Sequence, residues 1–365
     1  MSGTVDMDVR TLTAAEVAGG ALPESVLDPD SLLEPVLIVE LDGADGATAR
    51  TAAARIAAWG SLAVGVCSGG IAPDLAPLTA ALDLTYATAE TADRSVVGVA
   101  DLDRARTEFL ARVQRCPQAS HIAGQVLRAS EDLPVPAAID VESLAYSTLQ
   151  GGAEFGAWLG ERRRLGRPLP PPPDTAPVLL SAEGDTLRIT LNRPERRNAY
   201  GTAVRDGLVE ALRTAVVADA FGRIVLDGAG SSFCSGGDLD EFGHTPDIAT
   251  AHLIRTRGGA ARLMARLADR IEVRLHGHCV GAGIEIAAFA GRVVAAPDTV
   301  VRLPEVAMGL IPGAGGTVSV PRRIGRWRAL HLFVTGVALD AERARAWGLV
   351  DEIVDAARRQ VAGSR

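Results

Sequence analysis

Runs of apolar residues alternate along this chain with segments in which apolar positions recur every three or four residues. The first pattern is typical of buried strands, and the second of helices that bury one face. Strands are predicted at 35–41, 61–66 and 96–99. Helices are predicted at 47–59, 74–84, 103–115, 119–129 and 135–164. A βαβ unit therefore opens the chain, and the later helices are interpreted as a layer that covers the fold.

Two segments depart from this alternation. Residues 1–30 are polar and mixed, so we expect them to be loosely held. Five prolines lie within 168–173, where they cannot continue a helix and favour an extended, semi-rigid chain. The segment 166–175 is therefore predicted to be a linker, with a proline-rich ligand as the alternative. It divides the chain into regions 1–165 and 176–365.

The second region begins with a predicted hairpin. Strands at 178–181 and 186–191 flank the turn Glu183-Gly-Asp185. Further strands are predicted at 223–227, 271–275 and 293–296, and helices at 202–218, 248–268 and 281–291. This alternation of strands and helices predicts a layered α/β fold.

Composition narrows the class of protein. Of 365 residues, 47% are hydrophobic and 22% charged, as in a globular protein. The net charge of −8, with no dominant basic patch, argues against nucleic-acid binding. The chain contains no lysine, which excludes a lysine Schiff base and the usual phosphate-loop lysine. Ser68-Gly-Gly70 lacks the dinucleotide-binding pattern and is interpreted as a plain turn.

Neither a metal site nor a membrane segment is expected. The four cysteines form no Cys-x-x-Cys pair, and the close pair His276 and His278 lacks a third ligand at a recognisable spacing. Residues 1–8 have neither the basic start nor the apolar run of a signal peptide. No apolar run approaches the ~20 residues that span a bilayer. We therefore expect a cytoplasmic protein that binds neither membrane nor metal.

Two glutamates carry the candidate chemistry. The strand 271–275 leads into a glycine-rich turn, and the helix after it has Glu285 in its first turn. Small residues at 281–283 let a ligand approach backbone N–H groups at the start of this helix, where the dipole favours negative charge. Glu305 lies in a second segment that ends in glycines. Two carboxylates beside an anion site suit acid–base chemistry on an activated carbonyl.

Five motifs, in order, resemble those of the crotonase (enoyl-CoA hydratase/isomerase) superfamily. They are Leu191-Asn-Arg-Pro-Glu-Arg-Arg-Asn-Ala199, Ser232-Phe-Cys-Ser-Gly-Gly-Asp-Leu239, Gly277-His-Cys-Val-Gly-Ala-Gly-Ile-Glu285, Pro304-Glu-Val-Ala-Met-Gly-Leu-Ile-Pro-Gly-Ala-Gly-Gly-Thr317, and Thr335-Gly336 with Ala344 and Gly348-Leu-Val350. The resemblance covers about residues 177–355 and implies the ββα spiral core of that family.

The resemblance implies roles for individual residues. The N–H groups of Ser235 and Ala282 would hold the thioester oxygen, and oxygens of this kind gain negative charge as an enolate forms. Glu285 would orient and deprotonate water for attack at Cβ, and Glu305 would supply a proton to Cα. The structural alternatives are a helix-start carboxylate for Glu285 and a surface acid for Glu305.

Coenzyme A would be the non-reacting part of the substrate, and no separate cofactor is implied. The positions that match its binding loops are Arg197, Ala199, Ser235, Gly236, Gly237 and Asp238. Arg193 and Arg196 would also lie near the phosphates, although three arginines in five residues could equally form a solvated loop. Asp238 could instead cap a following helix. Cys234 and Cys279 are interpreted as buried small side chains, not nucleophiles.

The sequence departs from the family pattern after Val350. Family members continue into a helical tail that completes the acyl pocket and the trimer contacts, whereas residues 103–165 of this chain resemble that tail. We interpret 35–101 as a shortened, degenerate crotonase-like unit, so that a non-catalytic N-terminal half lends its helices to the C-terminal core. The alternative is an independent helical appendage.

The leading functional hypothesis is an enoyl-CoA hydratase-like lyase acting on a 2-enoyl-CoA thioester, as a homo-oligomer such as a trimer. Two alternatives of the same fold are a Δ3,Δ2-enoyl-CoA isomerase and an aryl-polyketide-CoA dehydratase or dioxygenase. From another class, the chain could be a non-catalytic acyl-CoA binder or assembly subunit.

Overall fold

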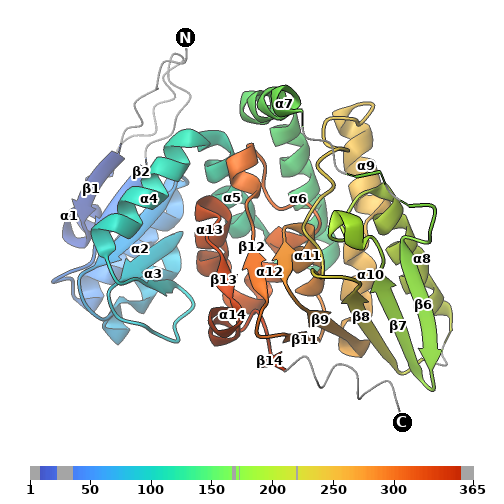
Figure 1. Cartoon of the computed structure of the whole chain (residues 1–365). Helices are drawn as coiled ribbons and strands as arrows, with labels where there is room; N and C mark the ends of the chain where they lie inside the picture. The colour runs from blue at the N-terminus through green and yellow to red at the C-terminus, as the bar shows by residue number, and fades with distance from the viewer. Residues whose placement is uncertain (1–8, 23–35, 167–169, 172, 219–220, 355–365) are drawn as a thin grey trace.

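The structure is a computed structural model that describes residues 9–22, 36–166, 170–171, 173–218 and 221–354. Residues 1–8 and 23–35, together with 167–169 and 172 of the predicted linker, therefore lie outside the described residues. A small sheet at the N-terminal end and a larger sheet near the C-terminal end are separated by helices from both parts of the chain (Figure 1).

The N-terminal sheet has five parallel strands in chain order. They are β1 (Val9–Thr13), β2 (Val36–Glu40), β3 (Ala63–Cys67), β4 (Leu84–Ala87) and β5 (Val96–Gly98). The helices on its outer face are α1 (Ala14–Gly19), α2 (Gly46–Trp59) and α3 (Ala76–Ala81), with the 3-10 turn η1 (Pro73–Leu75) before α3. The predicted strands and the helix at 47–59 are found. The helix predicted at 74–84 ends earlier, at Ala81, and an additional strand, β4, begins at Leu84.

The expectation of a loosely held start is wrong for residues 9–19. Strand β1 pairs with β2 in parallel, with Val9 opposite Val36. Thr13 and Glu16 form a reciprocal capping box at the start of α1. The Thr-x-x-Glu spacing was a readable signal for this helix.

Side-chain alternation in β2 divides the N-terminal core in two. Leu37 and Val39 belong to a cluster that packs against α1–α3. Val36 and Ile38 point to the opposite face and belong to a second, larger cluster, which continues through the C-terminal part as far as Val350. Because one core is shared across the chain, the two regions form a single packed body. That residues 35–101 are a degenerate crotonase-like unit stays a prediction.

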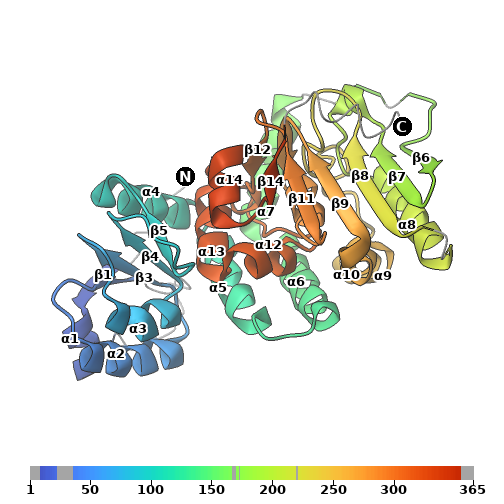
Figure 2. The same cartoon turned by 90° about the horizontal axis from the view of Figure 1, so that it is seen from below.

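Four helices form the layer between the sheets. They are α4 (Leu102–Arg115), α5 (Pro117–Ser130), α6 (Val135–Gln150) and α7 (Ala153–Leu165). The single helix predicted at 135–164 is two helices, because the adjacent Gly151 and Gly152 interrupt it, and glycine costs about 1 kcal/mol in a helix interior. Seen from below, α5 and α6 lie under α12 and α13 (Figure 2).

The C-terminal region is built on a six-stranded sheet in the order β14-β11-β9-β8-β7-β6, in which only β6 runs antiparallel to its neighbour. Its strands are β6 (Val178–Glu183), β7 (Thr186–Leu191), β8 (Arg223–Gly228), β9 (Ile271–Leu275), β11 (Arg292–Ala295) and β14 (Glu352–Ile353). A three-stranded sheet holds β10 (His278–Val280), β12 (Val300–Arg302) and β13 (Leu339–Asp340).

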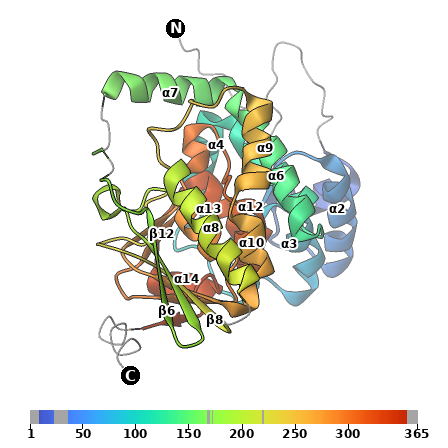
Figure 3. The ribbon, with the colours of Figure 1, turned by 90° about the vertical axis from the view of Figure 1, so that its right-hand side faces the viewer.

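Helices cover these sheets. They are α8 (Thr202–Val217), α9 (Ile248–Gly258), α10 (Ala261–Arg266), α11 (Ala282–Ala287), α12 (Gly316–Ile324), α13 (Arg326–Thr335) and α14 (Ala341–Trp347). The 3-10 turns are η2 (Pro194–Arg196), η3 (Ala268–Arg270) and η4 (Glu305–Met308). Helix α8 packs on β6 and β7, and α10 lies against α8 (Figure 3). The helix predicted at 248–268 is broken at Gly258–Gly259, and the one predicted at 281–291 ends at Ala287.

Buried polar contacts reinforce the junction between the regions. The Tyr86 hydroxyl lies 2.9 Å from Nδ1 of His331 on α13. Two nitrogens of Arg328, also on α13, donate to backbone carbonyls of the N-terminal region, including those of Thr91 at 2.9 Å and Asp93 at 3.0 Å. Burial of the ring lowers the pKa of His331 to about 4. None of the described helices is long and apolar enough to cross a membrane.

Residues 175–365 expressed alone should fail to fold cooperatively. Helices α5 and α6 cover α12, and α4 and α5 cover α13, so their removal exposes part of the shared core. Each large apolar side chain returned to water costs roughly 1.5–3 kcal/mol. Circular dichroism during urea unfolding, with gel filtration, measures the effect.

The control for this truncation is the full chain cleaved within 166–175 with both pieces retained, which should stay folded. A fragment that unfolds cooperatively and is as active as the full chain would show that the N-terminal region is a dispensable appendage.

Candidate active site

A cavity of about 370 Å³ lies where α6 meets the loops of the C-terminal region. From the C-terminal region it is lined by Glu285, Glu305, Ser235, Gly236, Gly237, Gly281 and Ala282, among others. From α6 it is lined by Ile139, Glu142, Ser143, Tyr146 and Gln150. Six of the residues predicted from sequence therefore meet at one cavity. The other three, Arg197, Ala199 and Asp238, do not line it.

Glu285 is held by the turn that begins α12. It lies in the first turn of α11 and is 2% exposed. Its Oε2 accepts hydrogen bonds from the N–H groups of Ala314, at 2.7 Å, and Gly316, at 2.9 Å. Burial, followed by the nearby Glu305 and Glu142 carboxyls, raises the pKa of Glu285 well above its usual value. This carboxyl group is therefore buried and hydrogen-bonded to a neighbouring turn, unlike a carboxylate exposed at the start of a helix.

Glu305 is the first residue of η4 and is also buried. Its Oε2 has no hydrogen-bond partner among the described residues. Burial, with a further contribution from Glu142, raises the pKa of Glu305 to about 8. A buried carboxyl group with this pKa carries its proton at neutral pH, and the alternative of a surface acid is wrong.

Gly281 makes room for Glu305. A Cβ atom at this position would collide with Oε1 of Glu305. Its φ of +49° also lies in the region that side-chain-bearing residues rarely adopt. Glycine is therefore required both by the backbone turn before α11 and by the neighbouring carboxyl group.

The two predicted oxyanion donors differ in their surroundings. The Ser235 N–H donates to the Arg197 carbonyl at 2.9 Å, a bond that it would have to exchange for one to a ligand. Two residues on, Gly237 also lines the cavity, and its N–H has no acceptor among the described residues. The same holds for the Ala282 N–H at the start of α11. Among the described residues, the N–H groups of Gly236, Gly237 and Ala282 at this cavity thus have no acceptor.

The three arginines of the predicted coenzyme loop differ in their surroundings. Arg193 is buried, and its guanidinium donates to the carbonyls of Thr175, at 2.7 Å, and Asn192, at 2.9 Å. Arg196 forms ion pairs with aspartates. Arg197 is exposed at a φ of +51° and makes no ion pair among the described residues. Only Arg197 therefore presents a guanidinium that is free for an anionic ligand.

Asn198 ties this loop to the neighbouring segment. Its Oδ1 accepts from the Arg193 N–H at 2.7 Å, and its Nδ2 donates to the carbonyls of Ala229 and Ser232, both at 2.9 Å. The adjacent Ala199 is buried, as are the atoms of Asn198 itself. Asn198 was not singled out from the sequence, because a lone asparagine in a loop gives no local signal of such bonds.

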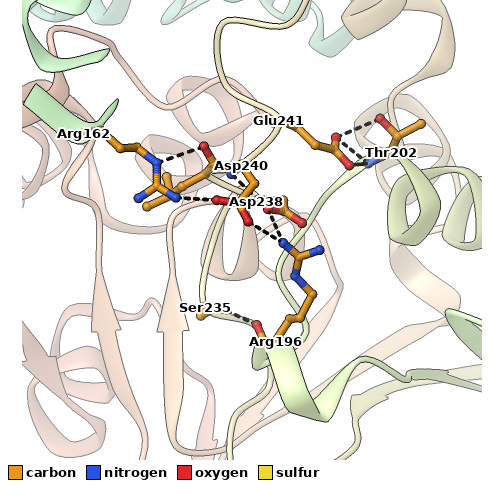
Figure 4. A network of polar contacts seen from close by, with 8 residues as sticks. Arg162, Arg196, Thr202, Ser235, Asp238, Asp240 and Glu241 are labelled. Atoms are coloured by element: carbon orange, nitrogen blue, oxygen red, sulfur yellow. Dashed lines mark hydrogen bonds and ion pairs between the residues drawn. The ribbon is translucent and has the colours of Figure 1, made fainter. Parts of the chain in front are cut away.

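A polar network fixes the loop that contains Asp238 (Figure 4). Arg196 pairs with Asp238 at 3.2 Å and with Asp240 at 2.9 Å. Arg162, from α7, pairs with Asp240 at 2.7 Å. Asp238 accepts from the Asp240 N–H and is followed by a turn, so it caps no helix. Helix α7 of the N-terminal region therefore helps to shape this side of the site.

Glu142, Tyr146 and Arg255 are among the lining residues that the sequence did not single out. Glu142 and Tyr146 lie on the buried face of α6, and Arg255 of α9 stacks over the Tyr146 ring at 4.6 Å. The one available signal was Glu142 itself, an acidic residue one helical turn from Ile139 within an apolar stripe.

The four cysteines are buried, and none of them forms a disulfide in the described part of the chain. Burial raises the pKa of Cys234 to about 12, so its thiol stays protonated at neutral pH. Among the described residues, no group of three His, Cys, Asp or Glu side chains is arranged to hold a metal ion.

Comparison with known proteins identifies the family to which this chain is similar. Residues 182–363 match the family model described as enoyl-CoA hydratase/isomerase. Over 183 residues the chain is 34% identical to the 1,2-epoxyphenylacetyl-CoA isomerase of Escherichia coli (strain K12), covering 49% of this chain and 70% of that protein. It is 33% identical to the 2,3-dehydroadipyl-CoA hydratase of the same organism, covering 48% of this chain and 68% of that one.

Among solved structures, one similar chain is a putative enoyl-CoA hydratase from Thermobifida fusca YX in complex with acetoacetyl-CoA. It is 27% identical, with a TM-score of 0.47, and the likeness covers 52% of this chain and 77% of that one. The sequence matches to the family model and to the two Escherichia coli enzymes establish the relationship: the chain belongs to the enoyl-CoA hydratase/isomerase family, within the crotonase superfamily.

Proposed function

We propose that this protein is an enoyl-CoA hydratase-like lyase that adds water to a 2-enoyl-CoA thioester or eliminates it. The observation that carries the proposal is the cavity where the buried carboxyl groups of Glu285 and Glu305 meet backbone N–H groups that have no acceptor among the described residues. One relative of this chain, the 2,3-dehydroadipyl-CoA hydratase of Escherichia coli, is by name a hydratase of a CoA thioester, which agrees with this assignment.

In the forward reaction Glu285 accepts a proton from water as the water oxygen bonds to Cβ of the enoyl group. Electrons of the double bond move onto the thioester, and the N–H groups of Ala282 and Gly237 hold the resulting enolate oxygen. Fixed donors of this kind cost no reorganisation during the reaction, and losing one costs about 3 kcal/mol in systems where this has been measured.

Glu305 completes the addition by giving its proton to Cα. Its Oε2 has no competing hydrogen bond among the described residues, and its raised pKa supplies a proton near neutral pH. Glu285 then passes the proton that it took from water to Glu305 or to solvent. This transfer returns the pair of glutamates to its starting charge. Water and substrate are the only reactants.

Arg197 is the residue best suited to a phosphate of the coenzyme A moiety. It is exposed, and its carbonyl accepts from the N–H of Ser235, which lines the cavity. Ser235 and Gly236 contribute backbone shape: the Gly236 carbonyl accepts from the Tyr200 N–H at 2.7 Å. Asp238 acts on the same loop through Arg196. Coenzyme A is thus part of the substrate, and no further cofactor takes part in the proposal.

A Δ3,Δ2-enoyl-CoA isomerase is the second candidate. One relative in Escherichia coli is named an isomerase, although of a different CoA thioester. An isomerase moves one proton and needs one acid–base carboxyl group, whereas hydration uses two groups. The dependence of the rate on each glutamate therefore discriminates between these reactions.

Glu285→Gln and Glu305→Gln should each lower kcat for hydration of crotonyl-CoA by a factor on the order of 10²–10⁴, because each removes a proton-transfer group. The loss of absorbance of the conjugated thioester measures the rate. A suitable control is Glu154→Gln. Glu154 is also a partly buried carboxylate held by two backbone N–H groups, but it does not line the cavity.

Wild-type protein that hydrates no 2-enoyl-CoA of any chain length would contradict the hydratase assignment, and retained binding of acyl-CoA would then favour a non-catalytic binder. Activity that depends on one glutamate alone, with double-bond migration as the product, would favour the isomerase.

The pH dependence of kcat/KM should be bell-shaped. The active form of the pair holds one proton, with Glu285 ionised and Glu305 protonated, so activity rises with pH as the pair loses its first proton. Activity falls again as the pair loses the second proton, which Glu305 must donate. The two limits belong to the coupled pair. Rates measured across both limits test this, and a profile without an alkaline decline would exclude Glu305 as the proton donor.

A further inference from the structure

Two carboxylates share the start of α12. The N–H groups of Ala314 and Gly316 donate to Glu285. The N–H groups between and after them, those of Gly315 and Thr317, donate to Glu142 at 2.7 and 2.8 Å. Four successive backbone donors thus alternate between a carboxylate of the C-terminal region and one of the N-terminal region. Neither set can move without displacing the other.

Glu142 is bound on this turn more firmly than a solvent-exposed cap would be. Its second contact to Thr317 is from the hydroxyl, at 2.7 Å, and its side chain is 2% exposed. It lies outside residues 182–363, which match the family model, so the family motifs assign it no role. It also lines the same cavity as Glu285 and Glu305.

Helix α6 makes a second contact with this turn one helical turn further along. A Cβ atom at Gly313 would collide with the ring of Tyr146, so the glycine is required by a side chain of the N-terminal region. Tyr146 and Glu142 therefore contact the turn 313–317 from one face of α6. Held in this position, the turn directs the N–H groups of Ala314 and Gly316 to Glu285.

We propose that Glu142 is a positioning residue of the active site: it holds the turn 314–317 in the arrangement that orients Glu285, and it places a third carboxyl group beside the two glutamates of the reaction. This inference rests on the proposed function for its kinetic consequence. Its structural consequence, a fixed Glu285 in a cluster of three carboxyl groups, is independent of the reaction.

The groups that face Glu142 come from five elements. They are Tyr146 on α6, Arg255 on α9, Thr317 on α12, Glu285 on α11 and Glu305 on η4. Burial raises the pKa of Glu142 to about 7, although the hydrogen bonds from Thr317 and Gly315 and the charge of Arg255, the cation among these groups, lower it. The negative charge of Glu142 in turn raises the pKa of both Glu285 and Glu305.

Glu142→Gln tests the proposal because it keeps the shape and removes one acceptor and the charge. An amide can accept from Gly315 or Thr317 but turns its own NH₂ group toward the other donor. We expect kcat to fall on the order of 10- to 100-fold with little change in KM, since a catalytic group displaced by about 1 Å can cost 10²-fold. Titration of ¹³C-carboxyl-labelled glutamates should show lower midpoints for Glu285 and Glu305, assigned from spectra of Glu285→Gln and Glu305→Gln.

The matched control is Glu154→Gln. Glu154 accepts from the N–H groups of Gln118, at 2.7 Å, and Ala119, at 3.1 Å, at the start of α5. It should lose comparable stability in urea unfolding while kcat and the titration of Glu285 stay as in the wild type. Where Glu142→Gln does not fold, Thr317→Val removes one of the three hydrogen bonds and should give smaller changes in the same direction.

Exchange of the α proton of a saturated acyl-CoA with deuterated water separates this inference from the reaction assignment. If wild type exchanges the proton without hydrating any enoyl-CoA, hydration is wrong, and the loss of exchange in Glu142→Gln still supports the role of Glu142. If wild type does neither, the titration alone decides. Unchanged midpoints in the folded variant, or unchanged kcat, would overturn the proposal.

Discussion

The structure depends on the burial of carboxyl groups in a cavity that neither region of the chain closes alone. A carboxylate removed from water costs several kcal/mol unless it is hydrogen-bonded or protonated. Glu285 and Glu142 meet this requirement with backbone N–H groups at the start of α12, whose dipole also favours negative charge. Oε2 of Glu305 has no such donor among the described residues, and burial raises the pKa of all three carboxyl groups. The three carboxyl groups therefore differ in their hydrogen bonds but share a raised pKa.

The N-terminal region supplies the wall that makes this environment dry. Helix α6 contributes Glu142 and Tyr146 to the cavity, and α7 contributes Arg162 to the network that fixes the loop at 238–241. Both helices are held in place by the core that continues from β2 to Val350. Burial of apolar surface in the shared core therefore sets the electrostatics of a site whose motifs lie in the other region.

The glycine-rich motifs have separate physical reasons at separate positions. Gly281 is required by its positive φ and by the space that Glu305 occupies. Gly313 is required by the ring of Tyr146, which comes from a helix far earlier in the chain. Glycines that look alike in the two motifs are thus required by different neighbours. Substitutions of Gly281 and Gly313 would disturb different parts of the site.

The sequence by itself determined the alternation of strands and helices and the place of Glu285 and Glu305 beside glycine-rich turns, because periodicity and glycine-rich turns are local signals. Only the tertiary structure decided that the Ser235 N–H donates to the Arg197 carbonyl, and that the Gly236 and Gly237 N–H groups have no acceptor among the described residues. It also decided that Glu142 faces the site and that adjacent glycines divide the long helices. Hydrogen-bond partners and desolvation depend on segments that meet only in the folded chain, and no local pattern records which segments these are.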